Sequence, residues 1–144
     1  MTLSPTTSAG LDLVLFHAGG LTCAVEASLV VALRDARTAP PAIALAELLD
    51  LAPASPIAPP SQARRLCVRQ GHRERWLAID EPVRHQHAPA AALYPLPPLV
   101  ATRCRIRCVR ALAWLRAHDA ESLAILLDPR HLPERAIRSG KPLV

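Results

Sequence analysis

Aromatic residues and lysine are both scarce in this chain. Phe, Trp and Tyr together make up 3% of the 144 residues, and Lys141 is the single lysine among 17 basic residues. Proteins that bind single-stranded nucleic acids commonly stack bases on aromatic side chains. The scarcity therefore weighs against that class of protein, although the formal net charge is +5. We expect the large rings of Phe16, Trp76, Tyr94 and Trp114 to lie in the core.

Long apolar runs are lacking too. No run approaches the roughly 18 residues that a membrane-spanning helix requires, so we expect no direct insertion into a membrane. Residues 1–10 contain no lysine or arginine ahead of the first apolar stretch. Because a secretory signal begins with basic residues, we expect a cytoplasmic protein.

Motifs of known catalytic sites are also missing. The chain contains no G-x-S-x-G sequence, and Gly19-Gly20 lacks the spacing of a phosphate-binding loop. Asp80 and Glu81 are adjacent, so in a strand their carboxylates point to opposite faces and are poorly placed for shared acid–base work. The sequence predicts no enzyme and no small-molecule substrate.

The spacing of cysteine and histidine does not favour a metal site. Cys104 and Cys108, on one strand, would lie about 13 Å apart, which is too far for one ion. His85 and His87 fall in a stretch that we expect to be an exposed loop. We therefore expect no cofactor and no metal. Four cysteines are expected as small buried residues in a reducing compartment, namely Cys23, Cys67, Cys104 and Cys108.

The apolar pattern favours short strands. With 51% hydrophobic and 20% charged residues, the chain is typical of one globular domain. Strands are predicted at 11–16, 21–25, 29–33, 66–68, 76–79, 103–115 and 123–127. Leu45, Leu48 and Leu49 share one face of a short helix. Proline-rich loops are expected at 52–62 and 84–98, and Pro82 is expected to end the strand before it.

A row of arginines alternates with apolar residues near the end of the chain. Arg103, Arg105 and Arg107 alternate with Cys104, Ile106 and Cys108, which is the period of a half-buried strand. With Arg110 the row could bind phosphates, and a basic β-barrel that binds nucleic acid is the alternative function. A solvated strand face that discourages edge pairing explains the same row.

Six segments, taken in order, resemble the CheW-like domain family. They are LVLFHAGGLTCAV (13–25), LVVALR (29–34), AIALAELLDL (42–51), RLCV (65–68), WLAIDEPV (76–83) and LAILLDPRHL (123–132). The resemblance implies a mainly β fold of two small intertwined β-barrels with one or two short helices. It also implies a non-catalytic adaptor that couples chemoreceptor tips to a chemotaxis histidine kinase, without an active site or cofactor.

Departures from the family pattern indicate a divergent, shortened member. Between Arg34 and Ala42 the chain lacks the family's stretch with an N-L-R-G sequence, which predicts a reduced first barrel. Ala32 and Ala44 stand where the family has acidic residues. We expect residues 1–10 as a loose leader, 11–132 as a single CheW-like domain, and 133–144 as a C-terminal tail.

The strand around residue 30 is the expected contact surface. Loss of neighbouring strands exposes a strand edge, and such an edge can add onto the sheet of a partner. We expect Val30, Val31 and Arg34 to bind that partner. The resemblance points to the regulatory domain of a chemotaxis histidine kinase, to a chemoreceptor, or to another CheW-like protein.

Overall fold

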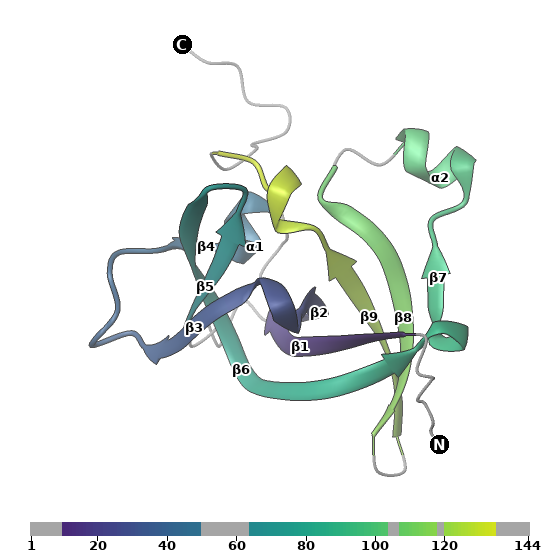
Figure 1. Cartoon of the computed structure of the whole chain (residues 1–144), viewed down its shortest axis with the longest axis horizontal. Helices are drawn as coiled ribbons and strands as arrows, with labels where there is room; N and C mark the ends of the chain where they lie inside the picture. Colours follow the sequence, from purple (N-terminus) through teal and green to yellow (C-terminus); the bar gives the residue numbers. More distant parts are fainter. Residues whose placement is uncertain (1–9, 50–63, 104–106, 118–119, 135–144) are drawn as a thin grey trace, which may run out of the picture.

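The structure is a computed structural model of the chain, and it describes residues 10–49, 64–103, 107–117 and 120–134. Within these residues the chain forms nine strands and two short α-helices. The strands form one sheet around two separate hydrophobic cores (Figure 1). The prediction of a mainly β fold with one or two short helices is confirmed. The expected loop 52–62 lies outside the described residues, as do most of the leader and the tail.

The described chain begins with a hairpin formed by the strands predicted at 11–16 and 21–25. Strands β1 (Gly10–Ala18) and β2 (Leu21–Glu26) pair antiparallel, with Ala18 opposite Leu21. Gly19 and Gly20 have φ values of 58° and 83°. A two-residue turn with positive φ at both positions matches the twist of the strands, and glycine adopts it at little steric cost.

The longest strand, β6 (Arg73–Pro89), belongs to both halves of the sheet. Its first half pairs antiparallel with β5 (Arg64–Gln70), and from Asp80 onward it pairs antiparallel with β1. The register shifts where residues 81–83 stand opposite Phe16. Pro82 is tolerated in this irregularity because the missing N–H is not needed there. The prediction that Pro82 ends the strand is therefore wrong, and residues 84–89 of the expected loop are strand.

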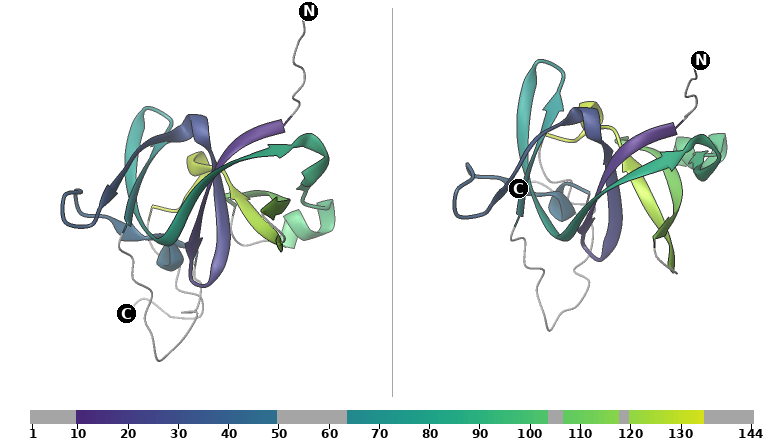
Figure 2. Two further views of the ribbon diagram at one scale, coloured as in Figure 1. Left: turned by 90° about the horizontal axis from the view of Figure 1, so that it is seen from below. Right: turned by 60° about the horizontal axis from the view of Figure 1, so that its bottom comes forward.

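Two lobes share the central strands. The first lobe contains β3 (Val30–Asp35), β4 (Ile43–Ala44), α1 (Leu45–Leu48), β5 and the first half of β6. The second lobe contains the second half of β6, β7 (Leu93–Pro95), α2 (Pro98–Arg103), β8 (Val109–Ala117) and β9 (Ala120–Leu127). The strand order is β3-β5-β6-β1-β2-β9-β8-β7, with β4 paired parallel to β6. Figure 2 shows β6 curving from one lobe into the other.

The first core is built from large side chains. Phe16, Leu66, Leu77 and Ile79 are at most 1% exposed and come from three strands. The short helix predicted from Leu45, Leu48 and Leu49 is confirmed as α1, which ends at Leu48, and all three leucines join this core. Leu127 and Leu132, from the end of the described chain, complete it.

The second core is built largely from alanine. Alternate residues of β1 divide between the cores, so that Leu13 and Leu15 face this one and Phe16 faces the other. Leu115 and Leu126 contribute the other large side chains. Five buried alanines fill the rest, namely Ala24, Ala88, Ala111, Ala113 and Ala124. Small residues allow the strands of this lobe to approach closely.

The region before β8 differs from the prediction. The strand expected at 103–115 begins at Val109, and residues 98–103 form α2 instead. Pro98 opens this helix, where a missing N–H has no consequence. No helix in the described part of the chain is long and apolar enough to cross a membrane.

Candidate protein-interaction surface

The outer edge of β3 is an open edge of the sheet. On one side β3 pairs with β5, from Val30 opposite Val68 to Asp35 opposite Arg64. On its other side no strand of the described residues pairs with it. Residues 36–42 lead directly to β4, which lies beyond β6. The first lobe is thus bounded by two strand edges, at β3 and β4, in the place where the sequence predicted missing strands.

The two valines of this edge have different environments. The register shifts between Val30 and Ala32, so Val31 is the extra residue of a bulge. Val30 is half-buried and packs against the first core, whereas Val31 is 40% exposed. A bulge re-aims side chains at a sheet edge. Val31 is therefore the valine available to a partner, and Val30 supports the strand from beneath.

Arg34 is held on the outer face of the same strand. Its guanidinium carbon lies 5.8 Å from the ring centroid of Trp76 on β6. Between these strands, on β5, lies Cys67, which is 1% exposed. Burial raises the pKa of the Cys67 thiol, and the Glu74 carboxylate raises it further. The thiol is therefore protonated, and this face offers packing and the Arg34 charge rather than a thiolate.

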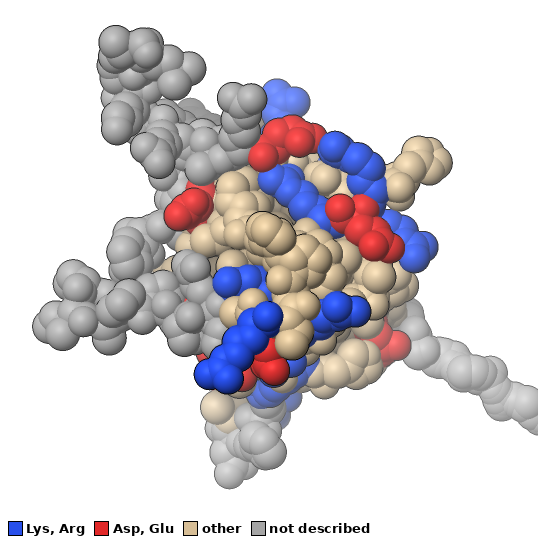
Figure 3. Space-filling model, turned by 90° about the vertical axis from the view of Figure 1, so that its left-hand side faces the viewer, with Lys and Arg blue, Asp and Glu red and all other residues tan. Residues whose placement is uncertain are grey.

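Charges of both signs surround this edge. Figure 3 shows acidic side chains interspersed among the basic ones on the side of the first lobe. Arg64 lies 3.5 Å from Glu81, and Arg73 lies 2.7 Å from Glu134. Each of these two arginines therefore has an acidic side chain beside it.

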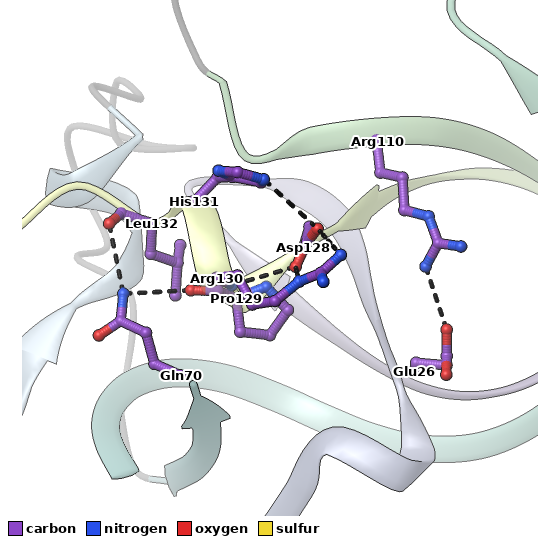
Figure 4. Close-up of polar contacts among 8 residues, drawn as sticks. All are labelled: Glu26, Gln70, Arg110, Asp128, Pro129, Arg130, His131 and Leu132. Carbon is purple, nitrogen blue, oxygen red and sulfur yellow. Dashed lines mark hydrogen bonds and ion pairs between the residues drawn. The ribbon is translucent and has the colours of Figure 1, made fainter. Parts of the chain in front are cut away.

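The segment LLDPRHL at 126–132 closes the first lobe from the other end of the chain. Asp128 caps the 3-10 turn Pro129–His131 by accepting a hydrogen bond from the Arg130 backbone N–H at 3.0 Å. The Arg130 guanidinium donates to both carboxylate oxygens, at 3.1 and 2.9 Å (Figure 4). These hydrogen bonds, the guanidinium's foremost, lower the pKa of Asp128.

Side chains of the β5–β6 hairpin donate hydrogen bonds to the backbone of residues 129–134. The Gln70 side-chain amide donates to the carbonyls of Pro129 and Leu132, at 3.1 and 3.4 Å. Arg75 donates to the carbonyls of Pro133 and Glu134, at 2.6 and 2.8 Å. Leu132 is buried in the first core as a result. This motif of the family resemblance has a structural role here, because it ties the end of the second lobe to the first.

The described members of the predicted arginine row do not share one strand. Arg103 belongs to α2, Arg107 lies in a turn, and Arg105 falls outside the described residues. Arg110 lies at the start of β8 and donates to Glu26 Oε1 at 3.0 Å. The described residues of the expected strand segment 103–108 are thus helix at Arg103 and turn at 107–108.

Three of the four cysteines lie among the described residues, and Cys104 lies outside them. Cys23, Cys67 and Cys108 are buried, and burial with the neighbouring Cys108 raises the pKa of Cys23 to about 12. His85 and His87 lie in β6 rather than in a loop, and His87 Nδ1 lies 2.8 Å from Asp12 Oδ1. The described residues contain no group of three or more histidine, cysteine or acidic side chains that could hold a metal ion.

Comparison with known proteins gives support at the level of the fold. No family model matches the chain, and no curated protein matches it in sequence. Among solved structures it is similar to the scaffolding protein TtCheW from Thermoanaerobacter tengcongensis, with a TM-score of 0.60 and 15% identity. The match covers 94% of this chain and 98% of that chain. The fold is therefore CheW-like.

Sequence reasoning missed a group of exposed aromatic residues. Phe16 is buried as expected, but Trp114 is 46% and Tyr94 52% exposed. Trp114 lies between Ala113 and Leu115, which both face the second core. In a strand the residue between two buried ones points outward. The alternation of small and large residues around Trp114 could therefore have predicted that its side chain is exposed.

Proposed function

We propose that this protein is a non-catalytic CheW-like adaptor in a chemotaxis-type signalling pathway. The observation that carries the proposal is the similarity to the scaffolding protein TtCheW along almost the whole of both chains. In the part of the chain that the structure describes, no three histidine, cysteine or acidic side chains gather into a possible metal site. Such an adaptor works in the cytoplasm, where it binds the regulatory domain of a histidine kinase, a chemoreceptor tip, or both.

The β3 edge is the proposed contact. Its unpaired backbone groups allow a partner strand to extend the sheet, which is the β-augmentation mode of recognition. Val31 presents an exposed apolar side chain on the bulge, and Arg34 presents a charge held by Trp76. Val30 acts by packing beneath the edge and keeping the bulge in place.

Titration calorimetry with the purified chain tests this function. The two titrants are the regulatory domain of a chemotaxis kinase and a receptor signalling tip from the same organism. We expect binding at micromolar strength to at least one of them. Absence of binding to both, by a chain whose circular dichroism shows folded β structure, would contradict the adaptor function.

A matched pair of variants tests the surface. Val31→Asp places a charge on the exposed edge and is expected to weaken binding about tenfold or more, as for a central contact. Val100→Asp makes the same change at an exposed valine of α2 in the other lobe and is expected to leave binding unchanged. Equal affinities for the two variants would move the contact away from β3.

A further inference from the structure

One face of the β2–β9 strand pair is buried in the first core at one end and exposed at the other. On the β2 and β9 strands, the side chains of Cys23, Val25, Ile125 and Leu127 point into the first core. Two residues before Cys23 and Ile125 on the same face lie Leu21 and Leu123. These are 39% and 47% exposed. The apolar face therefore continues beyond the edge of the first lobe, where the described residues leave it partly exposed.

The exposed part is widened by β8. Trp114 stands directly opposite Leu123 and is 46% exposed. Leu112 lies two residues before Trp114 on the same face, and Tyr94 of β7, which is 52% exposed, stands opposite it. Four large exposed apolar side chains on adjoining strands are more than the scattered single residues of an ordinary surface. We call this patch, made of Leu21, Tyr94, Leu112, Trp114 and Leu123, the β8–β9 face.

An ion pair borders the apolar patch at the tip of the β8–β9 hairpin. Arg116 stands opposite Glu121, one step beyond the Trp114–Leu123 pair, and its Nε donates to Glu121 Oε1 at 3.2 Å. Hydrogen bonds from Arg116, and a weaker one from Trp114, lower the pKa of Glu121.

We propose that the β8–β9 face binds a second copy of this chain about a two-fold axis. The axis lies outside the sheet, above this face, and runs parallel to β8 and β9 over the line midway between them. Such an axis exchanges the β8 and β9 sides of the ladder. Trp114 then packs on Leu123 of the other copy, and Arg116 meets Glu121 of the other copy. The arrangement is self-complementary because each step of the ladder joins unlike side chains, large with smaller and cation with anion.

The anatomy of the face fits this occupant. An apolar centre with an ion pair at its rim is the usual composition of an interface between subunits. The rim carries one arginine and one glutamate that are already paired within the chain. A partner with a strong charge of one sign would therefore gain little at this rim, whereas a copy of the chain matches it. The face is also separate from β3, so this proposal goes beyond the adaptor function.

Sedimentation equilibrium of the full chain over a wide concentration range tests the proposal without any signalling partner. We expect a reversible monomer–dimer equilibrium. Trp114→Ser and Leu123→Ser should each weaken the dimer about tenfold or more, as expected for central apolar contacts. The controls Leu99→Ser, at an exposed leucine of α2, and Val31→Asp should leave it unchanged. A wild-type chain that stays monomeric overturns the proposal, as do controls that weaken the dimer equally.

Charge exchange tests the two-fold arrangement. Arg116→Glu and Glu121→Arg each bring like charges together in a homodimer, so each variant alone should be largely monomeric. An equimolar mixture should dimerise, because every position 116 then meets an opposite charge at position 121. Association in the mixture no stronger than that of either variant alone would overturn this arrangement. Circular dichroism of each variant establishes that it is folded.

Discussion

Asp128 has the most closely defined role of any single residue in this structure. It is 7% exposed, it caps a 3-10 turn, and it accepts both the backbone and the guanidinium hydrogen bonds of Arg130. A carboxylate in this position is stabilised in its charged form, since all its donors are lost or weakened on protonation. Its function is to fix the point where the chain crosses from β9 back to the first lobe.

The pH dependence of stability should reflect this residue. Because the pKa of Asp128 is lowered in the folded chain, its contribution is present above the ordinary value of 3.8. That contribution is lost as the pH falls from there through the lowered pKa. We expect Asp128→Asn to be less stable than wild type at pH 7, with the difference shrinking below pH 3.8. Urea unfolding at a series of pH values measures it.

Glu121→Gln is the control for that series. Its carboxylate also has a lowered pKa, but the Arg116–Glu121 pair is exposed at a hairpin tip. Exposed ion pairs contribute little to stability. A pH-dependent difference for Glu121→Gln as large as that for Asp128→Asn would contradict the role given to Asp128.

At the scale of the elements, local signals in the sequence were reliable. The strands expected at 11–16 and 21–25, those at 66–68 and 76–79, the α1 helix and the strand that ends before Asp128 all follow from nearest-neighbour patterns. Each is fixed by turn chemistry or by the spacing of a few apolar residues. These elements lie largely within the segments that carry the family resemblance.

The errors arose where a distant partner decides the structure. β6 continues past Pro82 because its second half pairs with β1. The alternation at 103–108 is only three residue pairs long, and α2 forms at its start instead of a strand. The exposure of Trp114 follows from its two neighbours, Ala113 and Leu115, facing the second core. Such contacts join residues far apart in sequence, so propensity alone does not reveal them.

The candidate contact surface was predictable in position and less so in detail. The missing stretch after Arg34 indicated an open edge at β3, and the described strands leave that edge unpaired. The bulge that separates the roles of Val30 and Val31 depends on the pairing with β5. Binding by these residues stays a prediction.

The alanine-rich core of the second lobe should tolerate no added volume. Ala124 is fully buried between Leu126, Ala113 and their neighbours. We expect Ala124→Leu to destabilise the fold by about 1–3 kcal/mol, because extra methylenes in a packed core force side chains from their rotamers. Urea unfolding followed by circular dichroism measures the change. The same substitution at the exposed Ala91 on the surface should have little effect, and a similar loss there would contradict the argument.

At the scale of the whole molecule, the two lobes should unfold together. β1 supplies side chains to both cores, and β6 supplies pairing to both lobes. Neither core can therefore open without removing strands from the other. We expect a single thermal transition, with the same midpoint by far-ultraviolet circular dichroism and by tryptophan fluorescence.

A truncation in the first core tests this coupling. Leu66→Ala is expected to cost about 2–5 kcal/mol and to lower that one midpoint by both probes. Ala124→Leu, in the other core, should lower the same midpoint. Two transitions that respond separately to the two variants would show that the lobes are independent.

The hydrogen bonding between the β5–β6 hairpin and residues 129–134 also bears on how the protein is made. The first core draws its walls from residues 16–79, yet Leu127 and Leu132 complete it. A ribosome releases the N-terminal part of the chain first. The first core is therefore incomplete until β9 and the turn after it have been synthesised. Until then the apolar side chains of the early strands are not fully buried. The nascent chain is therefore exposed to aggregation and to chaperones until Leu127 and Leu132 have been synthesised.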